Sequence, residues 1–592
     1  MVKTRNEKLL ASQEEFIEQL TEDKARLQKT VEAALLENKA LKARISELEG
    51  ATASSNTPAA LPVKPLLQTS AGKAVIWLPK TIKELNAAKA PALVVNTHNM
   101  FHRGYHITDE QQYSVDLAKT GGDLKIEAGA GSGKTSALAA ISAEFARKRG
   151  LYIAFNKAIV TDAQKVFNHS TQCRTGHSLA FREIGHRYAN NDRLKSRLTS
   201  EAVIRALSLT NYHDLSAWTV ATLLINWVAR FCQGGDAAIG VKNVPWDYMK
   251  LLTREGDKAK AYEIGKIYAM ELKPHVTKLW ELLSDPDGTL PITHDIYLKV
   301  WALTNPRLPY DFILFDEAQD ANGVMMTLVH QQNLQKIWVG DRRQQIYSWR
   351  GAVNAMDEIQ TDHVSSLTRS FRYGQPIAEM ANVVLRNFLE EKNFSIVGSP
   401  SVQSTIGVYK NPKAILCRTN RTAISELMKA LSDGLRVHMA GGVSDLILEV
   451  ESAEALMQGR RPRSPALQVF KTWNQLVEYS ETEAGADLAP LVKILDQWSP
   501  RVLLEALRKT EPVQELEADV VIATVHKTKG REFDTVRLTG DFAFPSTPTL
   551  ESKMPFSPEE GRLLYVGLTR AKFGLDITDC LAAQVALEGI AA

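Results

Sequence analysis

The 592-residue chain is poor in cysteine, lacks long apolar runs and has almost no excess of either charge. Its four cysteines lie far apart with no C-x-x-C pair, which argues against a zinc ribbon, an iron–sulfur cluster or a disulfide framework and favours a reducing compartment. No stretch approaches the roughly 18 uninterrupted apolar residues of a membrane span. The N-terminus is a charged helix rather than a signal peptide. We therefore expect a soluble protein that is cytoplasmic or nucleoid-associated and has no membrane partner.

The charge balance excludes one class of function. Lysine and arginine number 71 against 68 aspartates and glutamates, so the net charge is only +3. A wholesale basic coat of the histone type is therefore excluded, although a local basic groove is not. Hydrophobic residues at 44% and charged residues at 23% are near the average of soluble globular proteins. At roughly 100–200 residues per domain, the length predicts three to five domains.

The first 50 residues have a seven-residue rhythm typical of a coiled coil. The two seam positions are occupied by Leu10, Ile17, Lys24, Val31, Asn38 and Ile45, and by Gln13, Leu20, Leu27, Ala34, Leu41 and Leu48. A polar residue such as Asn38 fixes the register of parallel two-stranded coiled coils. The pattern therefore predicts that residues 1–50 form a coiled coil that pairs two copies of the chain as a homodimer. The alternative is a solitary amphipathic helix. Residues 51–104 are expected to form a linker, rich in Ala, Ser and Pro at its start, and a small N-terminal segment.

A strand, a glycine loop and a helix follow one another from residue 123. Residues 123–127 alternate as a strand does, and residues 136–149 are alanine-rich and predict a helix. The loop between them is Ala128, Gly129, Ala130, Gly131, Ser132, Gly133, Lys134 and Thr135. Glycines allow backbone N–H groups to turn towards a phosphate chain, lysine reaches the β and γ oxygens, and the hydroxyl binds Mg²⁺. The pattern predicts binding of ATP with Mg²⁺.

A pair of carboxylates completes a hydrolytic site. Residues 312–315 (FILF) are all apolar, as expected of a parallel strand buried on both faces, and Asp316 and Glu317 follow directly. Phosphoryl transfer requires in-line positioning and charge neutralisation. We expect Asp316 to hold Mg²⁺ together with Thr135, and Glu317 to polarise the attacking water.

These two features belong to a longer series of motifs, and the chain resembles the superfamily I DNA helicases of the UvrD, PcrA and Rep type from about residue 107 to residue 572. Shorter segments resemble bacterial relatives of the F-box DNA helicases. The motifs occur in family order at residues 107–111 (ITDEQ), 128–135 (AGAGSGKT), 316–320 (DEAQD), 339–352 (VGDRRQQIYSWRGA), 367–372 (LTRSFR), 524–533 (TVHKTKGREF) and 559–570 (EEGRLLYVGLTR).

The resemblance implies how the nucleotide base and sugar are bound. Gln111 is expected to read the adenine edge, Phe371 to stack on adenine and Glu532 to contact the ribose. Phe371 stands where the family usually has tyrosine, and stacking survives that change.

The resemblance also assigns the γ-phosphate to three further residues. Gln344 would sense it, Arg372 would reach it from the second motor domain, and Arg570 would be the arginine finger. An arginine finger contributes about 10³ to 10⁵ in rate where measured. With Lys134, Asp316 and Glu317, these three complete the expected catalytic set.

For single-stranded DNA, the resemblance points to residues spread over several motifs. They are Phe155, Asn156, His177, Tyr347, Trp349, Arg350 and His526. Trp349 is the strongest candidate for base stacking, which contributes roughly 1–3 kcal/mol per base.

The family's architecture implies an α/β fold with two RecA-like domains and mostly helical insertions, preceded by the coiled coil. The expected parts are motor domain 1A (residues 105–181 and 296–363), insertion 1B (182–295), motor domain 2A (364–440 and 513–592) and a short insertion 2B (441–512). Residues 460–463 (RRPR) in insertion 2B favour a solvated basic turn over a phosphate contact.

We therefore expect an ATP-dependent single-stranded DNA translocase and helicase, moving 3′ to 5′ and acting on single strands and duplex junctions. The alternative is an ATP-switched, DNA-binding scaffold that recruits a partner protein through its coiled coil. A small-molecule kinase with a glycine loop cannot account for the later motifs in order.

Overall fold

The described part of the chain begins after residue 80. The computed structural model describes residues 81–91, 101–102, 105–155, 157–189, 193–196, 198–213, 215–253, 258–346, 355–464, 466–481, 488–542 and 557–588. The chain divides into a unit of residues 1–77 and a unit of residues 78–592, and every described residue belongs to the second. The predicted coiled coil of residues 1–50 and most of the predicted linker lie outside the described residues.

The first sheet has six parallel strands in the order β5-β4-β6-β7-β3-β8. They are β3 (Leu124–Ala128), β4 (Gly150–Ile153), β5 (Thr171–Arg174), β6 (Phe312–Phe315), β7 (Gln335–Gly340) and β8 (His363–Leu367). All four residues of β6 are buried, as its apolar sequence predicts. Because β8 pairs with β3, the first sheet extends four residues beyond the boundary expected at residue 363.

Helices connect these strands. The strand-flanking helices are α3 (Asp109–Lys119), α4 (Lys134–Glu144), α5 (Lys157–Gln164), α12 (Gly323–His330) and α13 (Ala355–Glu358). The predicted helix over residues 136–149 ends at Glu144, because the chain must turn to begin β4 at Gly150. A Cβ atom at Gly150 would lie 2.4 Å from the ring of Phe312, so the strand passes too close to β6 for any other residue.

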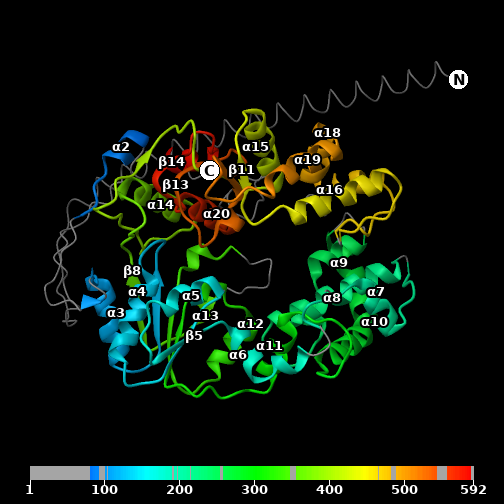
Figure 1. The fold of residues 1–592 in the computed structure, drawn as a ribbon, viewed down its shortest axis with the longest axis horizontal. Coiled ribbons are helices and arrows are strands. Elements are labelled where there is room, and N and C mark those ends of the chain that lie inside the picture. Colours follow the sequence, from blue (N-terminus) through cyan, green and yellow to red (C-terminus); the bar gives the residue numbers. More distant parts are fainter. Residues whose placement is uncertain are drawn as a thin grey trace, which may run out of the picture. The chain divides into compact units, whose positions relative to one another are not determined.

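A helical segment separates β5 from β6. It contains α6 (Gly176–Glu183), α7 (Ser200–Leu207), α8 (Ala217–Gln233), α9 (Trp246–Thr253), α10 (Lys258–Ser284) and α11 (His294–Leu303). Figure 1 shows α7, α8, α9 and α10 lying together. Their core is built around α8, whose Trp227 and Phe231 are completely buried.

The second sheet is also six-stranded and parallel, in the order β11-β12-β10-β13-β14-β9. Its strands are β9 (Thr405–Ile406), β10 (Ala414–Cys417), β11 (Val437–Met439), β12 (Val520–Thr524), β13 (Phe533–Leu538) and β14 (Ala571–Asp576). The α/β class predicted from the sequence is confirmed.

The second sheet has its own set of helices. They are α2 (Ile82–Ala87), α14 (Gln375–Phe388), α15 (Asn420–Ser432), α16 (Ser444–Met457), α17 (Trp473–Ser480), α18 (Ala489–Gln497), α19 (Pro500–Thr510), α20 (Pro558–Leu568) and α21 (Leu581–Glu588). Helices α16 to α19 lie between β11 and β12 in the chain. Among the described residues, no helix is both long and apolar enough to cross a membrane.

Candidate nucleotide-binding site

The glycine loop connects β3 to the N-terminus of α4. Gly131 and Gly133 both have φ of +75°, in the left-handed region that glycine adopts without strain. A Cβ atom at Gly131 would lie 2.6 Å from the hydroxyl of Ser370 and 2.7 Å from Cβ of Arg372. The loop therefore needs glycine for its backbone angles and for its close neighbours. Its turned N–H groups, at the positive end of α4, form a cradle for an anion.

Lys134, the first residue of α4, forms an ion pair with Glu317. Its Nζ lies 3.0 Å from one carboxylate oxygen and donates to the other at 3.1 Å. Burial alone would lower the pKa of Lys134, but the charges of Glu317, Asp316 and Asp341 outweigh it and raise the pKa. The lysine is therefore held as a cation beside the loop, where a phosphate can exchange for Glu317 as its partner.

Asp316 lies at the end of β6 and faces the loop. Its Oδ2 accepts hydrogen bonds from the hydroxyls of Thr135 at 3.2 Å and Tyr152 at 2.7 Å. Burial, together with the charge of Glu317, raises the pKa of Asp316. A hydroxyl beside a carboxylate is the oxygen donor set that suits Mg²⁺, which binds through one or two carboxylates, phosphates and waters. The residues present therefore fit the ion.

Glu317 has φ of +52°, an uncommon value for a residue with a side chain. Its carboxylate accepts a hydrogen bond from Nε2 of Gln319 at 2.6 Å in addition to the pair with Lys134. Burial alone would raise the pKa of Glu317, but Lys134 and Lys529 outweigh it and lower the pKa to about 2. Glu317 is thus an ionised carboxylate held in a strained backbone, a combination that clusters at functional sites.

Cations of the second sheet reach the same place. Arg570 precedes β14 and is 1% exposed. Its Nη2 donates to Oε1 of Gln344 at 3.1 Å. Burial, with the neighbouring charge of Arg372, lowers the pKa of Arg570 to about 9. Arg372 itself donates through Nε to Glu532 at 2.9 Å.

These groups enclose a cavity of about 350 Å³. It is lined by Gly131, Ser132, Gly133, Lys134, Thr135, Ser136, Phe155, Ile159, Glu317, Asp320, Gln344, Arg372, Lys529, Gly530 and Arg570. Gln111 and Phe371 lie close to Gly133, which lines this cavity. A Cβ atom at Gly133 would lie 2.9 Å from Nε2 of Gln111 and 3.3 Å from the Phe371 ring. The structure thus brings the predicted phosphate and adenine residues around one loop.

The predicted nucleic-acid residues are not gathered in this way. Asn156, Tyr347, Trp349 and Arg350 lie outside the described residues. Phe155 is 59% exposed and lines the nucleotide cavity.

Two histidines of the same set lie on other elements. His177, in α6, contacts Asp295 with 2.8 Å between Nε2 and Oδ1. His526 follows β12 and lines a second groove of about 960 Å³, together with Arg418, Arg421 and Lys527, and Lys529 lines both this groove and the first cavity. The predicted DNA contacts of all these residues stay predictions.

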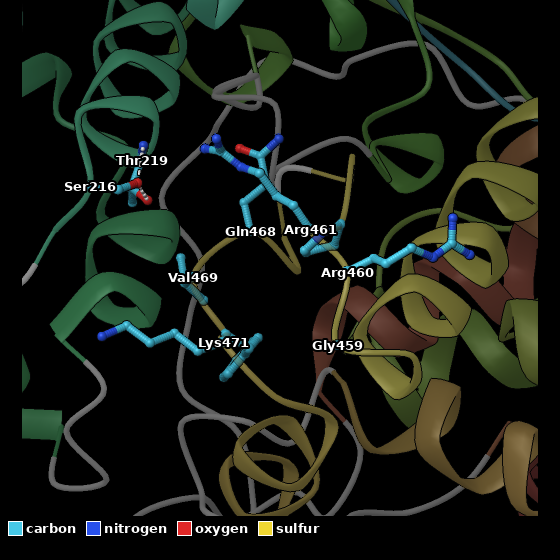
Figure 2. Close-up of a pocket in the computed structure, with 10 residues that line it drawn as sticks. Ser216, Thr219, Gly459, Arg460, Arg461, Gln468, Val469 and Lys471 are labelled. Carbon is cyan, nitrogen blue, oxygen red and sulfur yellow. Dashed lines mark hydrogen bonds between the residues drawn. The ribbon is translucent and has the colours of Figure 1, made fainter.

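The basic turn at residues 460–463 is placed by its neighbours. Arg461 lies over the ring of Trp218, 4.3 Å from its centroid, and Arg463 pairs with Glu451. Arg460, Arg461 and Arg463 are exposed. Figure 2 shows the cavity that this turn shares with the start of α8, in which Arg460 points away from Ser216.

Sequence reasoning missed several residues that complete the nucleotide site. Lys529 donates to Asp320 at 2.6 Å and to the carbonyl of Gln344 at 2.6 Å. Tyr152 donates to Asp316, and Asp341 accepts from Nε2 of Gln344 at 2.7 Å. Lys529, Asp320 and Asp341 lie inside the motifs quoted above, and that position is the sequence feature that could have identified them. Tyr152 lies outside those motifs.

Comparison with known families finds two domain matches. Residues 255–363 match the UvrD/REP helicase N-terminal domain, and residues 443–582 match the UvrD-like helicase C-terminal domain. The first match includes Asp316, Glu317 and Gln344, and the second includes His526, Glu532 and Arg570.

Individual relatives span most of the chain. It is 31% identical to F-box DNA helicase 1 of Gallus gallus over 82% of this chain and 50% of the relative. It is 29% identical to F-box DNA helicase protein 1 of Schizosaccharomyces pombe over 81% of this chain and 58% of the relative. Identity to the ATP-dependent DNA helicase PcrA of Leuconostoc citreum is 27% over 45% of this chain and 38% of the relative. The chain thus spans between half and three fifths of the two F-box helicases.

Proposed function

Because this chain belongs to the UvrD-like helicase family, we propose that it is an ATP-dependent DNA helicase, a motor that moves along single-stranded DNA and unwinds duplexes. The observation that carries the proposal is the shared cavity. Lys134 and Glu317 come from the first sheet, and Arg372 and Arg570 come from the segments of the second. Two RecA-like motor domains that clamp one triphosphate in this way couple its hydrolysis to their own closure.

The residues divide the work of hydrolysis. The loop N–H groups and Lys134 bind the β- and γ-phosphates, while Gln111 and Phe371 hold the adenine. Thr135 and Asp316 would hold Mg²⁺, which when bound neutralises phosphate charge. Glu317 orients the attacking water, and Gln344 senses the γ-phosphate. Catalysis of this kind is positioning and charge stabilisation rather than covalent chemistry.

Arg570 changes partner in this mechanism. Its guanidinium donates to Gln344, so the proposed γ-phosphate sensor and arginine finger contact each other. When a γ-phosphate is bound, both groups turn to it, and the transition-state charge is stabilised only with Arg570 in place.

The DNA track is proposed to pass the groove beside His526, with Arg418, Arg421 and Lys527 near the phosphates and Trp349 stacking a base. The proposed direction is 3′ to 5′. This direction is supported by residues 345–351 (QIYSWRG), a pattern that resembles the UvrD type.

Strand-displacement assays on duplexes with a 3′ tail, a 5′ tail or an RNA tail test the proposal. We expect unwinding of the 3′-tailed DNA duplex, and loss of unwinding in Glu317→Gln, because a general base contributes about 10²- to 10⁴-fold. Unwinding only from a 5′ tail would contradict the direction. DNA-stimulated hydrolysis with no unwinding of any duplex would favour the ATP-switched scaffold.

The proposed dimer is tested separately. Residues 1–50 are proposed to pair two chains in parallel, so removing them should halve the mass in solution. Equal monomeric masses with and without these residues would contradict the dimer and leave the motor proposal unaffected.

A further inference from the structure

The peptide groups of Ala130, in the middle of the glycine loop, are held by two tyrosine hydroxyls. Its N–H donates to the hydroxyl of Tyr565 at 3.2 Å, and its carbonyl accepts from the hydroxyl of Tyr373 at 3.1 Å. Ala130 and both tyrosines are completely buried. Water cannot replace these hydrogen bonds, and an unpaired buried peptide group is costly.

The two tyrosines do not belong to the loop's own sheet. Tyr565 lies in α20, and Tyr373 follows the crossover out of β8. Both pack in the apolar cluster of the second sheet, and Ala130 packs in that cluster too. By contrast, Ala128 at the start of the loop packs in the cluster of the first sheet. The loop therefore begins in the apolar core of the first sheet, and its middle packs in the apolar core of the second sheet.

A chain of hydrogen bonds continues from Tyr565 to the catalytic groups. Its hydroxyl donates to Oδ2 of Asp341 at 3.0 Å. The same oxygen accepts from Nε2 of Gln344 at 2.7 Å, and Oε1 of Gln344 accepts from Arg570. Burial raises the pKa of Tyr565, so its hydroxyl stays protonated and can donate. Tyr565 therefore bonds to both the loop and Asp341, whereas the hydroxyl of Tyr373 donates to the loop carbonyl of Ala130.

We propose that Tyr373 and Tyr565 are positioning residues through which the second motor domain holds the nucleotide loop in its phosphate-binding shape. Tyr565, through Asp341, also sets the position of Gln344. The inference rests on the proposed function only in assigning ATP to this loop. A loop that is pre-organised in this way loses less freedom when it binds phosphate.

The first test measures binding of MgADP to the full chain in the absence of DNA, for the wild type and for Tyr373→Phe and Tyr565→Phe. Each substitution keeps the buried ring and removes one hydrogen bond to Ala130, so we expect binding to weaken by about 3- to 10-fold. Tyr565→Phe also removes the hydrogen bond to Asp341. Tyr188→Phe is the matched control, because its buried hydroxyl also donates to a backbone carbonyl, that of Ser284 at 2.6 Å, far from the loop in sequence. It should bind MgADP like the wild type.

The second test separates the two tyrosines by steady-state ATP hydrolysis with saturating single-stranded DNA. Tyr373→Phe should raise KM and leave kcat within about twofold, because its hydroxyl donates to the loop carbonyl rather than to Asp341. Tyr565→Phe should raise KM and also lower kcat by about tenfold, because it frees Asp341 and Gln344. In the double variant the loss of MgADP affinity should be smaller than the product of the two single losses, since either substitution releases the loop at the same residue, Ala130.

The outcomes are distinguishable from failure of the proposed function. If the wild type binds MgADP but single-stranded DNA does not stimulate its ATP hydrolysis, the motor proposal fails. The MgADP binding measurements still test the role of the two tyrosines in that case. If both phenylalanine variants bind MgADP and hydrolyse ATP like the Tyr188→Phe control, the positioning role is overturned. Equal losses in all three variants would also overturn it, because they would reflect general destabilisation.

Discussion

The two parallel sheets differ in what occupies the turn between a strand and the helix that follows it. In the first sheet, β3 passes into a glycine loop whose residues 131–135 line a cavity of about 350 Å³. In the second sheet, β10 passes into α15 through Arg418 and Thr419, and the N–H groups of both donate to Asp541, at 3.0 and 2.8 Å. The second sheet therefore fills with its own carboxylate the place where the first sheet leaves room for a phosphate.

The difference explains why one chain needs both sheets. The first sheet supplies the anion cradle and the carboxylates Asp316 and Glu317, which alone cannot neutralise a transition state. The second contributes cations such as Arg570 and Lys529, and Asp541 occupies its turn between β10 and α15. A complete site exists only where they meet, and four changes test this division.

The largest effect is expected from Arg570→Ala, which removes the second sheet's contribution. We expect kcat for ATP hydrolysis to fall by at least about 10³-fold while MgADP binding changes little. Arg570→Lys keeps the charge but loses the planar fork, so it should recover only part of the rate. Arg436→Ala is the control, since it removes an exposed pair with Asp519 at 2.9 Å. Equal rates of ATP hydrolysis in Arg570→Ala and the wild type would show that the second sheet does not contribute to catalysis through Arg570.

The next effect is expected from Gly131→Ala, which closes the cradle of the first sheet. A methyl group there must displace Ser370 or Arg372, so we expect MgADP binding to weaken by about 10- to 100-fold, the equivalent of 1–3 kcal/mol of overpacking. Gly434→Ala isolates the backbone cost, because Gly434 has φ of +76° with no atom within 4 Å of the added Cβ. Isothermal titration should show normal MgADP affinity in that control.

A smaller effect is expected on the DNA side of the second sheet. His526→Ala should weaken binding of single-stranded DNA by about fivefold, the equivalent of one lost stacking contact of about 1 kcal/mol, with MgADP binding unchanged. Fluorescence anisotropy with a labelled oligonucleotide measures this. His275→Ala, at an exposed position of α10, is the control. A loss of MgADP affinity in His526→Ala would mean that the two sites are not separate.

The smallest effect on nucleotide chemistry is expected from Asp541→Ala. It leaves the N–H groups of Arg418 and Thr419 without their carboxylate, so the melting temperature should fall. MgADP affinity should stay within about twofold of the wild type, and titration should give one nucleotide per chain. A second nucleotide bound by this variant would show that the second sheet is a nucleotide site blocked by its own side chain.

Local patterns made much of the nucleotide site predictable. The strand, loop and helix around Lys134 lie within a short stretch, and the apolar run before Asp316 identified a buried strand because its four residues face two layers. The order of the later motifs predicts that Gln344, Arg372 and Arg570 lie together, and all three line one cavity with Lys134.

Contacts between distant segments were not predictable. Tyr565 lies 435 residues from Ala130, and nothing local indicates that its hydroxyl meets that peptide group. Gly150 approaches Phe312, 162 residues later in the chain, and the hydrophobic pattern around Gly150 does not indicate that contact. Asp541 likewise caps a turn 123 residues before it. Such partners depend on how the two sheets are connected rather than on any local preference.

The most direct test of the shared site is phosphate release by the full chain with and without single-stranded DNA, in the wild type and in Arg570→Ala. The account predicts that DNA stimulates hydrolysis by the wild type, because it favours closure of the cavity between Lys134 and Arg570, and that the variant shows no stimulation. A wild-type rate that is unchanged by DNA, or a variant that is stimulated as strongly as the wild type, would contradict it.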